Sequence, residues 1–247
     1  MARRFIVKSN DLNVIDNNHF VITGSEVKHI QVLRHNIDDE IVINKYVCKI
    51  TKMTKDSVEV DVIKEAEEKG IPNINLTLYM AILKNDKMDY VVQKAVELGV
   101  KKIVPFFSNN VIVKLDEKGK IKRMEKLQIV ADEACKQCGR TDEVLVGNFL
   151  SFKQMLNDLK ENNMNIFAYE NNNEENSFRN TLNVCKENGY KNIGCIVGAE
   201  GGFEVKEAED IANLSNVKTI SLGERILRAE TAALNIVSVI MYELDNI

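Results

Sequence analysis

The stretch that decides the fold is Ile193-Gly194-Cys195-Ile196-Val197-Gly198-Ala199-Glu200-Gly201-Gly202-Phe203. Its first five residues are apolar or small, which is typical of a fully buried strand, and helical spacing follows over about Val205–Leu214. Gly198, Gly201 and Gly202 allow a ligand to approach the backbone closely and allow turns with positive φ. The stretch predicts a strand, a ligand-binding loop and a helix, although a plain strand-to-helix turn would use the same residues.

The ligand class follows from the charge of this loop. The dinucleotide fingerprint G-x-G-x-x-G is absent, and Glu200 stands where it would repel a pyrophosphate. The helix that follows also begins with acidic residues, Glu204 and Glu207. A cationic or neutral ligand therefore fits this loop better than a phosphate.

Strands and helices alternate on both sides of this stretch, from residue 71 onward. Strands are expected at Leu76–Leu83, Ile103–Phe107, Asn165–Tyr169, Ile193–Val197 and Val217–Leu222. Helices are expected at Met88–Leu98, Ile121–Gln137, Phe152–Leu159, Val205–Leu214 and Ala229–Leu244, with Gly99 and Gly139 ending two of them. Such alternation predicts an α/β domain with a mostly parallel sheet, in which ligands bind at the carboxyl ends of the strands.

The first 70 residues have a different pattern, with short β-branched runs. Strands are expected at Phe20–Gly24, Glu40–Ile43 and Ser57–Val62, and a short helix capped by Ser25 is expected over Ser25–Arg34. The polar segment Lys64–Pro72 looks like a linker. We therefore expect a small β-barrel over 1–70 and a second domain over 71–247.

A second candidate loop is Ser221–Asn235. Gly223 and the backbone of Ile226 and Leu227 could form an apolar slot with exposed amides, which would suit a purine ring. Glu230 lies where a helix dipole favours an acid. Alternatively, Ile226 and Leu227 are ordinary core residues and Arg228 and Glu230 are a surface pair; both interpretations stay open at this stage.

Composition limits the classes of protein. The chain has 247 residues, a formal net charge of −4 and five cysteines, with neither a signal-peptide pattern nor an apolar run of the roughly 20 residues that a membrane helix needs. Reduced thiols and a cytoplasmic location are expected. The segment Lys84–Lys126 is basic, which leaves nucleic acid possible, but a solvated helix face is the simpler interpretation.

The pair Cys135-x-x-Cys138 is a weak signal for zinc, because a structural site needs four ligands. No second pair of cysteines or histidines accompanies it, so no metal site is expected. A helix that ends at Gly139, with Arg140 projecting from the turn, is the preferred interpretation.

Four segments in order carry a family resemblance: Lys87–Val100, Glu133–Arg140, Gly198–Phe203 and Leu222–Ala232. Together they resemble the bacterial 16S ribosomal RNA uracil-N3 methyltransferases of the trefoil-knotted SPOUT superfamily. His29-x-x-Val32-Leu33-Arg34 is similar to the N-terminal PUA-like RNA-binding barrel of that family.

The resemblance implies a deep trefoil knot, S-adenosylmethionine bound in it, a homodimer, and methylation of a uridine near the 3′ end of 16S rRNA in the small ribosomal subunit. The chain departs from the family pattern at Ala199, Ala229 and Asn109-Asn110-Val111, which puts a role for Asn110 in doubt. A ribose 2′-O methyltransferase of the same superfamily and a non-catalytic RNA-binding protein are the alternatives. A dinucleotide oxidoreductase is disfavoured, because the fingerprint is missing.

Site residues follow from the two loops and the resemblance together. Arg228 is expected to stabilise the uracil anion, and Glu230 to accept a proton or orient that arginine. The expected cofactor residues are Gly198, Glu200, Gly201, Gly202, Leu222, Gly223, Ile226, Leu227 and Thr231. The expected RNA contacts are Arg3, Arg4, Arg34 and Arg140.

Overall fold

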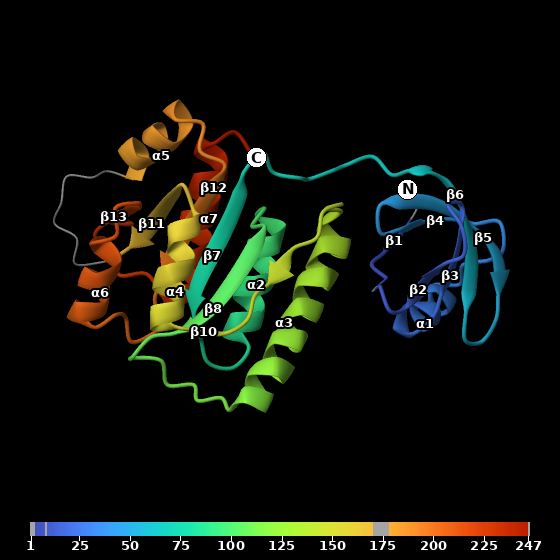
Figure 1. Cartoon of the computed structure of the whole chain (residues 1–247), viewed down its shortest axis with the longest axis horizontal. Coiled ribbons are helices and arrows are strands. Elements are labelled where there is room, and N and C mark those ends of the chain that lie inside the picture. The colour runs from blue at the N-terminus through green and yellow to red at the C-terminus, as the bar shows by residue number, and fades with distance from the viewer. Residues whose placement is uncertain (1–2, 8, 170–177, 247) are drawn as a thin grey trace. The chain divides into compact units, whose positions relative to one another are not determined.

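The structure is a computed structural model that describes residues 3–7, 9–169 and 178–246. The chain divides into two compact units (Figure 1). The first comprises residues 1–71 together with 136–142, and the second comprises 72–135 and 143–247. The short segment 136–142 belongs with the first unit although the sequence pattern gives no sign of it.

The first unit is a six-stranded sheet with the order β1-β4-β5-β6-β3-β2, curled around an apolar core (Figure 1). All of its strand pairs are antiparallel except β1 with β4. The strands are β1 (Arg4–Phe5), β2 (Leu12–Val14), β3 (His19–Ile22), β4 (Glu40–Ile43), β5 (Tyr46–Met53) and β6 (Val58–Glu65). Alternation along β3 places Phe20 and Ile22 in the core, so the strand pattern seen in the sequence is confirmed.

One helix, α1 (Ser25–Val32), closes this unit and buries Val27 and Ile30. The predicted cap at Ser25 is wrong, since the N-cap residue is Gly24 with φ 75° and no side chain caps the helix. The helix also stops before Arg34, which lies outside it with φ 58°.

The segment 136–142 is fastened to this unit by side chains. Lys136 Nζ lies 2.8 Å from Glu26 Oε1, and the Arg4 guanidinium donates to the Thr141 carbonyl at 2.8 Å. The Thr141 amide donates to the Lys69 carbonyl at 3.1 Å. These contacts link three separate stretches of the chain within one unit.

The second unit is a parallel sheet with the order β10-β8-β7-β12-β11-β13, and β9 also pairs with β8. The strands are β7 (Asn75–Ala81), β8 (Lys102–Phe107), β9 (Leu145–Val146), β10 (Leu150–Ser151), β11 (Met164–Ala168), β12 (Asn192–Val197) and β13 (Val217–Ile220). All of the strand pairs of this sheet are parallel. The predicted α/β class with a parallel sheet is therefore confirmed.

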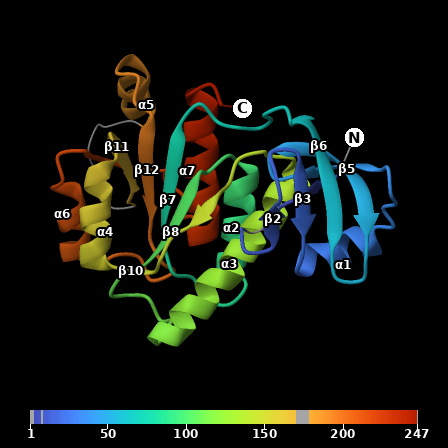
Figure 2. The same ribbon diagram turned by 45° about the vertical axis from the view of Figure 1, so that its right-hand side comes forward.

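Helices cover both faces of this sheet (Figure 2). They are α2 (Lys87–Glu97), α3 (Glu117–Cys138), α4 (Phe152–Asp158), the 3₁₀ turn η1 (Leu159–Glu161), α5 (Phe178–Glu187), α6 (Val205–Ala212) and α7 (Ala229–Glu243). Met155 of α4 and Ile211 of α6 pack in one core with Tyr79 and Phe167 of the sheet. Helix α7 packs against α2, β12 and β7 on the other face. The sequence pattern missed α5.

The order of the strands positions the loops. Strand β12 lies near the middle of the sheet, β13 lies at its edge, and β11 separates them. The chain leaves the edge strand β13 and returns to the middle of the sheet, where α7 packs. Because the strands are parallel, the loops after β12 and β13 emerge at the same edge, where ligands bind in such sheets.

Candidate active site

A pocket of about 590 Å³ opens where these two loops meet. That volume lies within the range of small-molecule sites. Its lining residues are Lys87, Ala168, Tyr169, Val197, Gly198, Ala199, Glu200, Gly201, Gly202, Phe203, Ser221, Leu222, Gly223, Arg225, Ile226, Leu227, Arg228, Ala229, Glu230 and Ala232.

The first wall of the pocket is the glycine-rich loop 198–203, which follows β12. A Cβ atom on Gly198 would lie 2.8 Å from the ring of Phe203, so only glycine lets the loop fold over that ring. Phe203 stacks on Phe106 with the ring centroids 6.2 Å apart and meets Phe167 edge-on at 5.1 Å. The loop is thus anchored in the apolar core through its last residue.

The segment after β8 supports this loop from outside the pocket. The Asn110 side-chain amide donates to the Gly201 carbonyl at 3.0 Å and lies 3.4 Å from the Gly202 carbonyl. A Cβ atom on Gly201 would lie 3.1 Å from the Cβ of Asn110, so the two segments are in close contact. Asn110 therefore holds the backbone of the glycine-rich loop.

The adjacent residue, Asn109, holds the start of α6. Its backbone amide donates to Glu207 Oε1 at 2.8 Å, and its side chain donates to Glu204 Oε2 at 2.8 Å. The buried Glu207 carboxylate also accepts the Glu204 amide at 3.1 Å, which completes a capping box. The two asparagines that depart from the family pattern therefore support the site.

The second wall of the pocket is the loop 221–228, which follows β13. Gly223 has φ 105°, and its amide donates to Ser221 Oγ at 3.1 Å. The side chain of Ile226 is 84% exposed, so the interpretation of Ile226 as a core residue is wrong. Arg228 is the N-cap residue of α7 and is exposed beside the pocket.

Lys87, the first residue of α2, connects the two walls. Its Nζ lies 3.1 Å from Glu200 Oε1 in the first loop and 3.8 Å from Glu230 Oε2 at the start of α7. Burial raises the pKa of the Glu200 carboxyl. Hydrogen bonds from Lys87 and from backbone amides lower the pKa by more than burial raises it, so it lies below its usual value. Glu230 thus pairs across the pocket with Lys87.

Most of the predicted cofactor and catalytic residues line this one pocket. Thr231 is the exception, because its side chain is exposed on α7 outside the lining. Sequence reasoning missed Lys87, Tyr169 and Phe203 as lining residues. In the sequence, the segment that begins at Lys87 carries only the family resemblance. Helical spacing alone cannot show that the side chain of its first residue reaches the pocket.

The predicted RNA contacts lie in the first unit, in different environments. Arg3 and Arg34 are exposed, whereas Arg4 is partly buried and donates to Thr141. Arg140 does not project from its turn as predicted. It is 3% exposed, and its Nε and Nη2 atoms donate to the two carboxylate oxygens of Asp142 at 2.9 and 2.7 Å. The Arg140 guanidinium is thus buried and paired with Asp142 within the segment 136–142.

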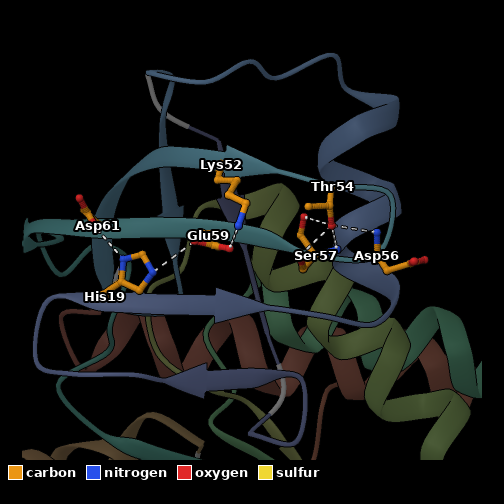
Figure 3. Close-up of polar contacts among 7 residues, drawn as sticks. All are labelled: His19, Lys52, Thr54, Asp56, Ser57, Glu59 and Asp61. Carbon is orange, nitrogen blue, oxygen red and sulfur yellow. Dashed lines mark hydrogen bonds and ion pairs between the residues drawn. The ribbon is translucent and has the colours of Figure 1, made fainter.

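A second polar cluster lies on the first unit, on strands β3, β5 and β6 (Figure 3). His19 Nδ1 lies 2.7 Å from Asp61 Oδ1, and His19 Nε2 lies 3.6 Å from Glu59 Oε2. Lys52 donates to Glu59 at 2.8 Å. The hydrogen bond to Asp61 raises the pKa of His19 above its ordinary value of 6.5.

Among the described residues, no group of histidines, cysteines and carboxylates is placed to hold a metal ion. Cys135 is buried and Cys138 is exposed. No helix within the described ranges is long and apolar enough to cross a membrane.

The fold and the site define an α/β domain whose ligand pocket is built by glycine-bearing loops at the carboxyl ends of parallel strands. The sequence model for the RNA methyltransferase domain matches residues 71–241. The chain belongs to the RNA methyltransferase family, as the resemblance predicts.

The chain is similar in sequence to known proteins over nearly its whole length. The chain is 33% identical over 236 residues to a ribosomal RNA small subunit methyltransferase E of Buchnera aphidicola, covering 89% of this chain and 86% of the relative. It is 29% identical to the protein of that name from Bacillus subtilis, covering 98% and 97% of the two chains. The crystal structure of the Neisseria gonorrhoeae protein of that name, bound to S-adenosyl methionine, is 26% identical with a TM-score of 0.80, covering 98% and 97%.

Proposed function

We propose that this protein transfers a methyl group from S-adenosylmethionine to N3 of a uridine near the 3′ end of 16S rRNA in the small ribosomal subunit. The observation that carries the proposal is the meeting of the loops after β12 and β13 in one pocket. The names of the relatives support methylation of small-subunit ribosomal RNA, and the S-adenosyl methionine in the Neisseria structure supports the methyl donor.

The pocket suits a sulfonium donor in size and in charge. Gly198, Gly201, Gly202 and Gly223 let backbone groups approach a ligand closely, while Leu222 and Leu227 add apolar surface. Glu200 and Glu230 provide negative charge near a cationic sulfur. When bound, the donor supplies an electrophilic methyl carbon, and the glycine-bearing loops hold it.

The remaining chemistry concerns the uracil. Its N3 atom lies on the pairing edge, so the base must leave its stack and enter the pocket. Negative charge then develops on the uracil carbonyls as the imide proton leaves, and Arg228 is the exposed cation in the lining that we assign to stabilise it. Glu230 is the carboxylate in the lining that we assign as proton acceptor.

The finer features of the fold are part of this proposal. We infer a trefoil knot in the second domain, 71–247, supported by the return of the chain from the edge strand β13 to the middle of the sheet. We infer that the first domain, 1–70, is a PUA-like RNA-binding barrel, with Arg3 and Arg34 exposed for phosphate contacts. We also infer a homodimer and a cytoplasmic location from the family resemblance.

The test uses small ribosomal subunits that lack the modification. Purified protein and S-adenosylmethionine are added, the rRNA is digested to nucleosides, and the products are separated by mass spectrometry. We expect 3-methyluridine, mapped to a single position near the 3′ end of 16S rRNA. A 2′-O-methylated nucleoside would make the protein a ribose methyltransferase, and RNA binding without any methylated product would make it a non-catalytic binding protein.

A further inference from the structure

Three charged side chains from distant parts of the chain meet inside the pocket. Lys87 begins α2, Glu200 lies in the glycine-rich loop, and Glu230 lies in the first turn of α7. The Lys87 ammonium hydrogen-bonds to Glu200 Oε1 at 3.1 Å and faces Glu230 Oε2 at 3.8 Å. One cation therefore forms ion pairs with two carboxylates, one in each wall of the pocket.

The two carboxylates differ in their surroundings. The side chain of Glu200 is 30% exposed, whereas that of Glu230 is 16% exposed. Glu230 Oε2 is inaccessible to solvent and accepts no hydrogen bond from any described residue. A buried carboxylate oxygen without a donor is costly, so a hydrogen bond from a ligand that reaches the Glu230 carboxylate, which lines the pocket, would be favourable.

The charged groups around Glu230 come from three elements. Lys87 faces it from α2, Glu200 lies across the pocket in the glycine-rich loop, and Arg225 and Arg228 line the same pocket in the loop before α7. The start of α7 favours an ionised acid in its first turn. Among the described residues, Lys87 is the ion-pair partner of Glu230, and it also offsets the charge of Glu200.

We propose that Lys87 is a positioning residue for the proton transfer: anchored by Glu200, it offsets the negative charge of Glu230 and keeps that carboxylate aimed at the imide N–H of the bound uracil. This inference rests on the proposed function and deepens it. In the step, the N3–H bond breaks and its proton passes to the Glu230 carboxylate. The N3 electron pair forms the bond to the methyl carbon, and the electrons of the breaking C–S bond go to sulfur, which leaves as neutral S-adenosylhomocysteine.

The geometry separates the roles of the three residues. Glu200 holds the ammonium by a direct hydrogen bond, so the position of Lys87 is set by the first loop. The longer separation from Glu230 leaves the Oε2 atom under the field of a cation while its hydrogen-bonding capacity stays open. A lysine that instead donated a hydrogen bond to this oxygen would compete with the substrate for it.

The experiment measures single-turnover methylation of small subunits as a function of pH, at saturating S-adenosylmethionine. We compare wild type with Lys87→Met, Lys87→Arg, Glu230→Gln and the double variant Lys87→Met/Glu230→Gln. Lys94→Met is the matched control, because Lys94 pairs with Glu97 on the same helix at 2.8 Å and does not line the pocket. Calorimetric binding of S-adenosylhomocysteine reports on the pocket independently of turnover.

We expect Lys87→Met to lower the rate at neutral pH about tenfold, because the Glu230 carboxylate loses the cation that holds it, and to move the acidic limb of the rate profile to higher pH. Lys87→Arg restores the position of the limb. Glu230→Gln removes the limb and lowers the rate about 10²-fold, and Lys87→Met adds little in that background, because residues that act through one another are not additive. Binding of S-adenosylhomocysteine changes by less than about threefold in every variant.

Two results would overturn the inference while the proposed function stands. One is a Lys87→Met protein that methylates with a profile of unchanged shape, whatever its overall rate. The other is an additive loss in the double variant. A wild-type protein that transfers no methyl group to the subunits overturns the proposed function and this inference together.

Discussion

The side-chain amide of Asn110 lies 3.0 Å from the carbonyl oxygen of Gly201, across the contact between the segment after β8 and the glycine-rich loop. The residues are 91 positions apart in the chain, and the parallel sheet brings them together. The bond acts on the backbone of the loop from outside the pocket. We therefore expect it to affect ligand binding without touching a ligand.

Replacement of Asn110 by alanine should weaken the binding of S-adenosylhomocysteine up to about tenfold, since a net hydrogen bond contributes about 0.5–1.5 kcal/mol. Asn110→Asp should weaken it further, because a carboxylate would face the Gly201 carbonyl. Isothermal titration calorimetry measures both. The matched control is Asn188→Ala. It removes a hydrogen bond of 2.8 Å that the Asn188 side-chain amide donates to the Val184 carbonyl, outside the pocket. Equal losses in the Asn110 and Asn188 variants would contradict the role of Asn110.

Gly223→Ala should lower the affinity for S-adenosylhomocysteine more than Gly189→Ala does. Both glycines have positive φ, 105° and 62°, and open space where a Cβ would lie. An L-residue in this region costs about 1–2 kcal/mol, so both variants lose some stability. Only Gly223 belongs to the pocket. Thermal unfolding and calorimetry measured side by side should show similar stability losses and a selective binding loss, and unchanged binding by Gly223→Ala would contradict the prediction.

Arg228→Ala should slow methylation about 10²-fold at saturating cofactor, with S-adenosylhomocysteine affinity within about threefold of wild type. The reason is that Arg228 is assigned to charge that develops only as the imide proton leaves. Arg179→Ala, on α5 and outside the pocket lining, is the control. A wild-type rate in Arg228→Ala would remove this assignment.

Arg140→Ala should destabilise the first unit by about 3–5 kcal/mol, because it removes the guanidinium that bonds both carboxylate oxygens of Asp142, a side chain that is 6% exposed. The double replacement Arg140→Met/Asp142→Leu should recover most of that loss, since apolar residues carry no desolvation penalty. Native-state hydrogen exchange at the buried residues Ile50 and Val60 measures the stability of this unit. Arg34→Ala, at an exposed position, should change it by less than about 0.5 kcal/mol.

If Arg140→Ala loses as little protection from hydrogen exchange as Arg34→Ala, then Arg140 does not stabilise the first unit and this prediction is contradicted. RNA binding gives a separate check. The folded double variant should bind small-subunit RNA like the wild type, whereas Arg34→Ala should reduce the salt dependence of binding by about one phosphate contact.

His19 should titrate above 6.5, because its hydrogen bond to Asp61 and the nearby Glu59 carboxylate favour the protonated ring. The folded-state pKa is raised, so this contact stabilises the first unit fully below about pH 6.5 and the contribution is lost as pH rises through the folded value. NMR titration of the ring should show a lower midpoint in Asp61→Asn. Asp56→Asn, in the turn between β5 and β6 and not joined to His19 by a dashed line in Figure 3, should leave it unchanged. An identical midpoint in wild type and Asp61→Asn would contradict this account.

Much of the fold could be predicted because its signals are local. Buried strands such as β12 are continuous apolar runs, helix α2 ends where Gly99 adopts φ 102°, and the core spacing of α7 is helical. Helix α5 was missed although its buried residues Thr181, Leu182 and Cys185 lie at helical spacing. The cap at Ser25 was misplaced by one residue, since Gly24 takes the left-handed turn that precedes α1.

The sequence by itself determined the parallel α/β class, the two glycine-bearing loops and the family, because each depends on backbone requirements or residue order along the chain. Only the tertiary structure decided that Lys87 pairs with residues 113 and more positions away, that Asn110 supports the glycine-rich loop, and that Arg140 is buried. The physical reason is that these contacts depend on which strands are neighbours in the sheet and on which segments pack together. Spacing along the chain carries no information about either.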